Sequence, residues 1–574
     1  MPSPFWCTAL TVTLLANWGL VAALGGPRAL QALRRAAATP FGRRALVEGA
    51  ALFALALLPR VLLAPCAPYH GEGPEYAYLD AACRPFLEQV SWPYHGGAGP
   101  VLYGIAMRLV PFAERTVYGL NAVLGALSAV LVRDVTTRLA ANRAAGLAAG
   151  LLFALLPGQV RLACSESLMI PLVFQWLLAL ALASRLRSGA RLREWALVAA
   201  LAVSATNTRP CGLLVLPMLA AVTGPLLVKR PSRLLWGLPL LAGLVPVLVS
   251  VGAEVVTGPA GQSRLANAPF ARALLDPATN PWWLPRVTPW LLHPGVQVAG
   301  AALLAWRRRW TALVVATIAV LGSEVLVLSQ AVALLNALRF TAPAAPFVAL
   351  LGGVATAGLT SAVRRRLPVP EAPLVAALVA LAVAVHAPDH LRLVTFEGNL
   401  QKEYRFLRRA IPALPDGSLV VSAAGWEADT HYSPAFPTCL AEPLGRRVTY
   451  ANLAWIRPLD EERAAHPGGV YAFVGLYCWS FPYGSPLLAR YPAPTPAPID
   501  AGTPLDTLLA SYTGRTWKHG VADGLQIPAC HDLRRRFAWT PLAEETATSA
   551  PELWFSVPSS SVTLGLYRLD RERP

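Results

Sequence analysis

The stretch 118–139, YGLNAVLGALSAVLVRDVTTRL, is followed at 145–166 by AGLAAGLLFALLPGQVRLACSE, and these two runs decide the fold. Each contains an apolar segment close to the ~20 residues that a helix needs to cross a hydrocarbon core. Arg133, Arg138 and Arg143 stand at the connection between them. Apolar runs joined by short basic connections are typical of a chain that crosses a membrane repeatedly.

The composition of the whole chain has the same character. The 574 residues are 55% hydrophobic and 14% charged, and the mean hydropathy is +0.47. Soluble enzymes carry about a quarter charged residues, so that class is excluded. The net charge of +17 would suggest nucleic-acid binding in a soluble chain. Here residues 1–387 hold 31 basic and 13 acidic side chains, whereas residues 388–574 hold 18 basic and 19 acidic ones. The excess of basic residues lies in the apolar part of the chain, so it indicates membrane topology and excludes a nucleic-acid partner.

Apolar runs recur from residue 5 to residue 387, and we expect about twelve transmembrane helices in a mainly α polytopic bundle. Their approximate spans are 5–25, 45–65, 117–138, 144–160, 167–184, 195–208, 211–228, 234–256, 292–306, 310–331, 341–361 and 371–387. The first run also resembles a cleaved signal peptide ending near Ala23-Leu24-Gly25. Because it lacks a basic region before its apolar stretch, we favour an extra N-terminal anchor.

Basic residues cluster in alternate connections, which gives the orientation. The six clusters are Arg28, Arg34, Arg35, Arg43 and Arg44; Arg133, Arg138 and Arg143; Arg185, Arg187, Arg191 and Arg193; Lys229, Arg230 and Arg233; Arg307, Arg308 and Arg309; and Arg364, Arg365 and Arg366. They hold 21 of the 31 basic residues before position 388, so they mark the cytoplasmic side. The prediction is an anchor and basic loop at 1–44, a transmembrane domain at 45–387 with an external loop at 66–116, and an external domain at 388–574.

The last 187 residues are long enough to bury a core of their own. Apolar or alternating runs at 418–422, 470–476 and 561–569 predict strands, and 401–411 predicts a helix. We expect a small mixed α/β domain that faces the exterior or periplasm. An external compartment permits disulfides, and Cys66–Cys83 or one pair among Cys439, Cys478 and Cys530 would fit, with reduced thiols equally open.

The first external loop opens with YHGEGPEYAY at 69–78, which places Glu72 and Glu75 three residues apart. Gly and Pro keep this stretch out of a helix, so the two carboxylates lie at the mouth of the membrane domain. The runs 76–90 and 100–112 predict interfacial helices too short to span. Solvated loop acids are the plain alternative, but clustering at the membrane mouth favours a function.

The order of these features resembles the GT-C superfamily of glycosyltransferases that use polyprenyl-phosphate sugars, such as protein O-mannosyltransferases and aminoarabinose transferases. The resemblance covers about 45–387. It rests on a helix ending near Arg60, an acid followed three residues later by a tyrosine (Glu75 and Tyr78), and surface helices in the first loop. It continues through the runs 118–139 and 145–166, Thr208-Arg209-Pro210, and LRFTAP at 338–343. Many members carry Asp-Glu at the loop acid pair, whereas this chain has Pro74 before Glu75. The resemblance therefore leaves Glu72 and Glu75 as alternative catalytic bases.

Sugar transfer from a lipid phosphate needs a base for the acceptor hydroxyl and cationic support for the departing phosphate. Arg209 and Arg339 lie in predicted external turns where their forked guanidinium groups suit phosphate oxygens, and Arg60 is a further candidate. Snorkelling to the interface is the alternative for each arginine. Glu166 is a candidate to orient the acceptor or hold a divalent cation, and His70 and His95 flank the loop as sugar or metal contacts or as incidental histidines.

We therefore expect a glycosyltransferase whose donor is a polyprenyl-phosphate sugar and whose acceptor is a glycan, lipid or protein. No bound cofactor is certain, and a divalent cation stays open. We expect an integral protein of a bacterial inner (plasma) membrane. A secondary transporter or flippase of lipid-linked substrates is one alternative, although it would place its acids near the bilayer midplane. A non-catalytic membrane scaffold with an external binding domain is another.

Overall fold

The computed structural model describes residues 4–67, 82, 98–110, 114–187, 190–229, 292–329, 341–395, 397, 399–422, 448–452, 456–475, 481–482, 536–548, 555–556 and 561–572. The chain forms two compact units. The helical unit is Met1–Pro65, Pro85–Gly104 and Gly119–Thr395, and the sheet unit is Cys66–Arg84, Ile105–Tyr118 and Phe396–Pro574. Each unit is described by itself.

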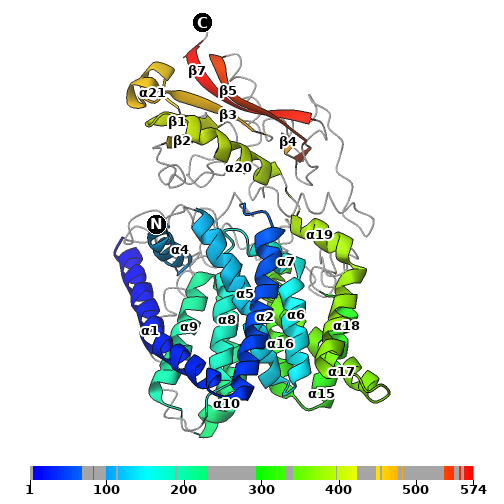
Figure 1. Ribbon diagram of the computed structural model, residues 1–574. Coiled ribbons are helices and arrows are strands. Elements are labelled where there is room, and N and C mark those ends of the chain that lie inside the picture. Colours follow the sequence, from blue (N-terminus) through cyan, green and yellow to red (C-terminus); the bar gives the residue numbers. More distant parts are fainter. Residues whose placement is uncertain are drawn as a thin grey trace. The chain divides into compact units, whose positions relative to one another are not determined.

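The helical unit is a bundle of apolar helices (Figure 1). Its elements are α1 (Pro4–Ala37), α2 (Pro40–Leu62), α4 (Ala98–Leu109), α5 (Glu114–Leu139), α6 (Arg143–Leu155), α7 (Pro157–Leu162), α8 (Met169–Ala183), α9 (Leu192–Thr208), η3 (Pro210–Leu214), α10 (Val215–Lys229), α15 (Pro294–Trp306), α16 (Trp310–Ser329), α17 (Ala345–Arg364), α18 (Glu371–Val385) and α19 (Ala387–Thr395). The mainly helical fold expected from the sequence is therefore confirmed.

Local sequence determines where several of these helices begin and end. Thr39 caps α2, since its hydroxyl accepts a hydrogen bond from the backbone N–H of Gly42 at 3.1 Å. Asn142 caps α6 in the same way. Pro157 cannot donate to the preceding turn, so the predicted span 144–160 is divided into α6 and α7.

Four helices of the described residues are long and apolar enough to cross a membrane. They are Gly42–Leu62, Glu114–Leu139, Cys211–Val228 and Ala345–Arg364. The pair α18 and α19 would add a fifth span with a 73° bend, and five further apolar helices are shorter. Because 234–256 lies outside the described residues, the full count of twelve stays a prediction.

Small residues allow the helices of this unit to approach closely. A Cβ placed on Gly353 of α17 would lie 2.4 Å from the carbonyl oxygen of Ala145 in α6. A Cβ on Gly300 of α15 would lie 2.1 Å from the carbonyl oxygen of Leu351 in α17. Apolar side chains gain little from association inside a lipid bilayer, so close backbone packing of this kind holds membrane helices together.

One end of the bundle collects basic side chains around two carboxylates. Glu48 of α2 accepts hydrogen bonds from Arg44, Arg133 and Arg143. Asp134 forms ion pairs with Arg138 at 3.3 Å and with Arg185 at 2.8 Å. Three of the basic clusters predicted to share one side of the membrane therefore lie at one end of the unit.

The sheet unit contains a five-stranded sheet in the order β2-β1-β3-β7-β5. Its elements are β1 (Ser418–Ser422), β2 (Val448–Asn452), β3 (Val470–Val474), β5 (Phe537–Thr548), β7 (Ser561–Glu572), the two-stranded β4 (Phe481–Pro482) and β6 (Phe555–Ser556), and the helices α20 (Asn399–Ala410), η8 (Ile411–Ala413) and α21 (Leu459–Ala465). Strand β1 pairs in parallel with β2 and β3, whereas β7 is antiparallel to β3 and β5. The predicted strands at 418–422, 470–476 and 561–569 and the helix at 401–411 are confirmed.

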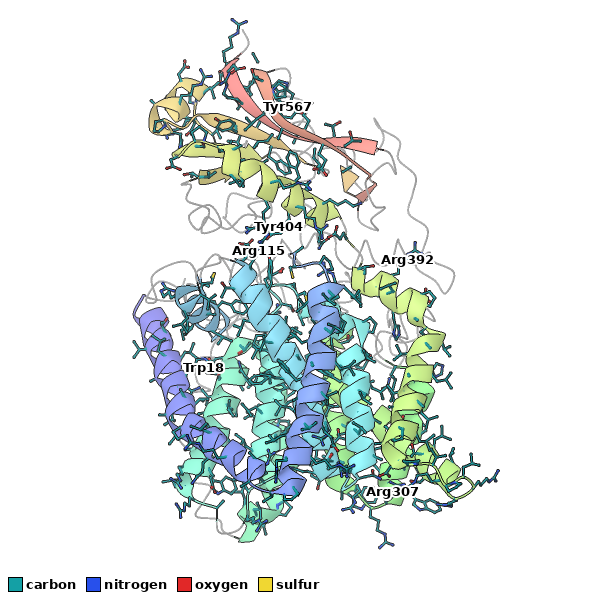
Figure 2. The ribbon with its side chains drawn as sticks, viewed as in Figure 1. Trp18, Arg115, Arg307, Arg392, Tyr404 and Tyr567 are labelled. Carbon is teal, nitrogen blue, oxygen red and sulfur yellow. The ribbon has the colours of Figure 1, made fainter. Side chains whose placement is uncertain are left out.

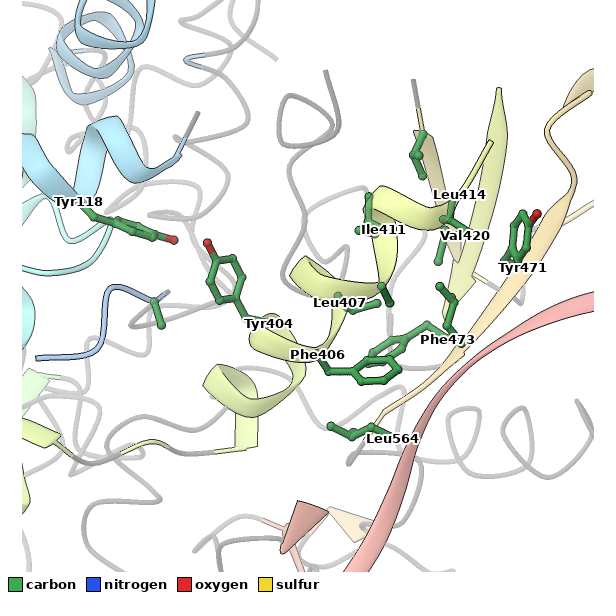
Figure 3. Close-up of a cluster of buried hydrophobic side chains, with 14 residues drawn as sticks. Tyr118, Tyr404, Phe406, Leu407, Ile411, Leu414, Val420, Tyr471, Phe473 and Leu564 are labelled. Carbon is green, nitrogen blue, oxygen red and sulfur yellow. The ribbon is translucent and has the colours of Figure 1, made fainter. Parts of the chain in front are cut away.

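Two apolar cores fill the faces of this sheet because alternate strand residues point to opposite sides. Phe406 and Leu407 of α20 pack with Val420 and Phe473 on one face, and the phenyl rings of Phe406 and Phe473 stack 6.0 Å apart (Figure 3). Leu459 of α21 joins the core on the other face, whose strand residues are Leu419, Val421, Val470, Ala472, Val474, Phe537, Tyr567 and Leu569.

Candidate functional site

The turn after α7 carries Glu166 and is held by a buried polar network. The Asn121 amide of α5 donates to the carbonyl oxygen of Ser165 at 2.7 Å and to the Tyr103 hydroxyl at 2.9 Å. The Tyr103 hydroxyl of α4 donates to the Glu166 carbonyl at 3.1 Å. All of these side chains are buried. The donated hydrogen bonds hold the turn in one conformation, whereas the Asn121 amide oxygen has no partner among the described residues.

Arg60 lies against this turn and is completely buried near the end of α2. Its Nη1 donates to the carbonyl oxygens of Ala56 at 2.5 Å and Ala154 at 3.1 Å. The Cys164 thiol donates to the Arg60 carbonyl at 2.8 Å. The Nε and Nη2 atoms of Arg60 have no hydrogen-bond partner in the part of the chain that the structure describes.

Arg161 of α7 is a second completely buried arginine, and it is not among the site residues predicted from the sequence. None of its three guanidinium nitrogens has a hydrogen-bond partner among the described residues. A guanidinium group stays charged at every physiological pH. Burying it without a partner costs several kcal/mol, about as much as breaking a buried ion pair. A lone Arg between two apolar runs was the sequence feature that could have identified it.

The structure places three of the predicted site residues. Arg60 and the Glu166 turn come together, and the Glu166 side chain is itself buried. Arg209 is 7% exposed and lies between α9 and η3, next to Thr208, whose hydroxyl donates to Gln175 of α8 at 3.2 Å. Glu72, Glu75, His70, His95 and Arg339 lie outside the described residues, as do Cys83, Cys439, Cys478 and Cys530.

A metal site is not formed by the described residues, which contain no group of three or more His, Cys, Asp or Glu side chains suited to an ion. The predicted helix at 100–112 is present as α4, whereas only Ala82 is described within 76–90. The interfacial position of both runs, the cation and the roles of the loop acids stay predictions.

The sheet unit has its own buried charged cluster around Glu114. This residue begins α5, and the first turn of that helix, up to Tyr118, belongs to the sheet unit. Glu114 is completely buried, and its Oε1 accepts a hydrogen bond from the Tyr404 hydroxyl and forms an ion pair with Arg408 Nη1, both at 2.5 Å. Burial, followed by the nearby Glu114 charge, raises the pKa of Tyr404 well above its ordinary value. The phenol is therefore a permanent donor to this carboxylate at neutral pH.

No protein-family model and no curated protein matches the chain. Among solved structures it is similar to the archaeal oligosaccharyltransferase AglB from Archaeoglobus fulgidus in complex with an inhibitory peptide and a dolichol-phosphate. The two are 14% identical with a TM-score of 0.44, over 90% of this chain and 76% of AglB. It is also similar to ArnT from Cupriavidus metallidurans bound to undecaprenyl phosphate, with 14% identity and a TM-score of 0.46 over 76% of this chain and 94% of ArnT.

Both of these proteins are GT-C glycosyltransferases, the superfamily that the sequence of this chain resembles.

Proposed function

We propose that the chain is a membrane glycosyltransferase that moves a sugar from a polyprenyl-phosphate donor to an acceptor hydroxyl on the external face. The acceptor oxygen attacks the anomeric carbon, the bond from that carbon to the phosphate oxygen breaks, and polyprenyl phosphate departs. Glu75 or Glu72 takes the hydroxyl proton. The arginines stabilise the negative charge that develops on the departing phosphate.

The observation that carries this proposal is the pair of buried arginines, Arg60 and Arg161. Two guanidinium nitrogens of Arg60 and all three of Arg161 have no hydrogen-bond partner among the described residues. An uncompensated buried charge is destabilising and persists where a ligand neutralises it. The forked N–H groups of arginine match phosphate oxygens, and a lipid-linked phosphate is the anion that a membrane-embedded site meets. Two such arginines would bind the donor phosphate from neighbouring helices.

The first test measures the affinity of the reconstituted protein for polyprenyl phosphate and for the uncharged polyprenol. We expect Arg161→Gln to weaken polyprenyl phosphate binding by about 10- to 100-fold, the equivalent of one or two charged hydrogen bonds. Polyprenol binding should not change. Arg138→Gln removes an exposed arginine of the same unit and serves as the control.

A second measurement separates a ligand-binding arginine from a structural one. Arg161→Met removes a buried charge that has no hydrogen-bond partner among the described residues, so the melting temperature without ligand should stay equal or rise. A clear fall in melting temperature, with phosphate affinity kept, would assign Arg161 to folding and remove the basis of the proposal.

The loop acids are tested by transfer from a polyprenyl-phosphate sugar. A general base contributes about 10²- to 10⁴-fold to rate, so Glu75→Gln should lose most turnover and keep donor affinity. Glu72→Gln is the matched variant three residues away. If the double variant binds the donor and turns over like the parent, neither acid is the base. Donor binding without any transfer by the parent would favour a flippase or transporter.

A further inference from the structure

The turn between α15 and α16 presents five consecutive exposed residues, Trp306-Arg307-Arg308-Arg309-Trp310. Trp306 is 87% exposed and Trp310 is 57% exposed. Figure 2 shows Arg307 at the end of the helical bundle where the turn between α1 and α2 also lies. We call these five residues the WRRRW turn.

The backbone of the WRRRW turn would suit glycine at its centre. The N–H of Arg309 donates to Leu304 at 2.8 Å and the N–H of Arg308 donates to Ala305 at 3.0 Å. These two bonds form a Schellman motif, whose central residue adopts a left-handed conformation that favours glycine. Arg308 occupies it with a φ of +54°. A charged side chain at a position that favours glycine for its backbone indicates that the charge itself is used.

The charges of this turn are not paired with carboxylates of the residues that the structure describes. Other clusters at the same end find carboxylates, since Glu48 and Asp134 pair with arginines of three connections. No ion pair involves Arg307, Arg308 or Arg309 among the described residues.

A second basic group adds to the positive charge at this end. Gly300 of α15 lies against Leu351 of α17, and Leu303 of α15 lies against Gly358 of α17. Residue numbers therefore increase in the same direction along both helices. Helices α15 and α17 therefore run parallel. Arg364–Arg366, at the end of α17, lie at the same end of the bundle as the WRRRW turn at the end of α15. Of these, Arg364 approaches Glu371 at 3.6 Å.

We propose that the WRRRW turn is a binding surface for anionic phospholipid headgroups. Tryptophan is enriched at the level of the headgroups, where its apolar ring and its N–H are both accommodated. Three arginines between two tryptophans present guanidinium groups to lipid phosphates at that depth. Each arginine near an anionic membrane surface strengthens attraction by about fivefold.

The test uses the purified full-length protein in detergent with equimolar phosphatidylglycerol and phosphatidylcholine of the same acyl chains. Native mass spectrometry counts the lipids retained. We expect the parent to retain an excess of phosphatidylglycerol, and Arg308→Gly to reduce that excess by about fivefold. Because glycine suits the left-handed position, the melting temperature of Arg308→Gly in lipid-free detergent should be unchanged or higher.

The control variant removes the same number of positive charges from another connection of the helical unit. The triple variant R307Q/R308G/R309Q should lose the lipid preference, whereas R187Q/R191Q/R193Q, which alters three exposed arginines of another connection, should keep it. Equal loss in both triple variants would mean that total charge, and not this turn, selects the lipid. Displacement of phosphatidylglycerol by millimolar inorganic phosphate would identify a soluble phosphate site instead. The measurement does not read sugar transfer, so its failure leaves the proposed function untouched.

Discussion

Gly125 of α5 is the residue that lets the fully buried Arg60 fit beside the Glu166 turn. A Cβ at this position would lie 2.9 Å from the Ala163 Cβ and 3.0 Å from Arg60 Nε. Gly125→Ala should therefore displace Arg60, with an overpacking cost of about 1–3 kcal/mol and weaker binding of polyprenyl phosphate. Thermal unfolding and lipid-phosphate titration measure the two effects.

The matched control lies on the same helix. A Cβ on Gly119 meets nothing within 4 Å among the described residues, so Gly119→Ala should leave binding unchanged and gain slightly in helix propensity. Equal effects of the two substitutions on lipid-phosphate affinity would show that Gly125 is not needed for the position of Arg60.

At the same scale, the sequence predicted some site residues and missed others for identifiable reasons. Arg60 could be predicted because it follows a long apolar run and precedes a loop that the sequence predicts to be external. Arg161 was not, because Pro157 divides its segment and the orientation of a side chain on the short α7 depends on packing from α19 and other helices. The buried state of the Glu166 turn depends on Asn121 and Tyr103, which lie 45 and 63 positions earlier.

At the scale of elements, the packing of α6 against α17 depends on a close approach of their backbones at Gly353. In Gly353→Ala the new Cβ would meet Ala145 O at 2.4 Å and Ala149 N at 2.7 Å, both backbone atoms that cannot rotate away. The helices must separate, so the free energy of unfolding should fall by about 3 kcal/mol, the upper end of overpacking costs. Circular dichroism melts of the protein in detergent measure the change.

Gly224 of α10 provides the comparison, because a Cβ there meets nothing within 4 Å in the described part of the chain. Gly224→Ala should match or exceed the parent in melting temperature. If Gly353→Ala is as stable as Gly224→Ala, the contact between α6 and α17 tolerates separation and does not hold the bundle together.

Element boundaries followed from sequence where side-chain periodicity was strong. Strand β1 was predicted residue for residue, and α20 differs from its predicted span by two residues at the start and one at the end. In α20 apolar residues recur at the helical period, and β1 is a short continuous apolar run. The bend of 73° between α18 and α19 was not predicted, because the apolar run ends at residue 387, where the more polar α19 begins.

In the whole molecule, the sheet unit takes in residues from the first loop as well as the C-terminal chain. Glu114 joins them through Tyr404 and Arg408. Glu114→Gln keeps an acceptor for the Tyr404 hydroxyl and removes the charge that Arg408 faces. Breaking a buried ion pair costs about 3–5 kcal/mol, so the unfolding transition of the sheet unit should shift down by several degrees.

The neighbouring exposed pair tests whether burial is the cause. Arg409 and Glu545 form an ion pair whose side chains are 64% and 44% exposed. Glu545→Gln should change the free energy of unfolding by less than about 1 kcal/mol. Comparable losses in Glu114→Gln and Glu545→Gln would contradict a special contribution from the buried cluster. Sequence patterns could not identify the Glu114–Tyr404 contact, because hydrophobic periodicity carries no information on partners 290 residues apart.

That separation has a consequence for how the protein is made. Glu114 leaves the ribosome 290 residues before Tyr404, and at 5–20 residues per second the interval is about 15–60 s. During that interval the carboxylate lacks its partners Tyr404 and Arg408, while the helices that follow are being inserted. Synthesis therefore includes a waiting period in which the first loop must be kept from misassembly until the last third of the chain is translated.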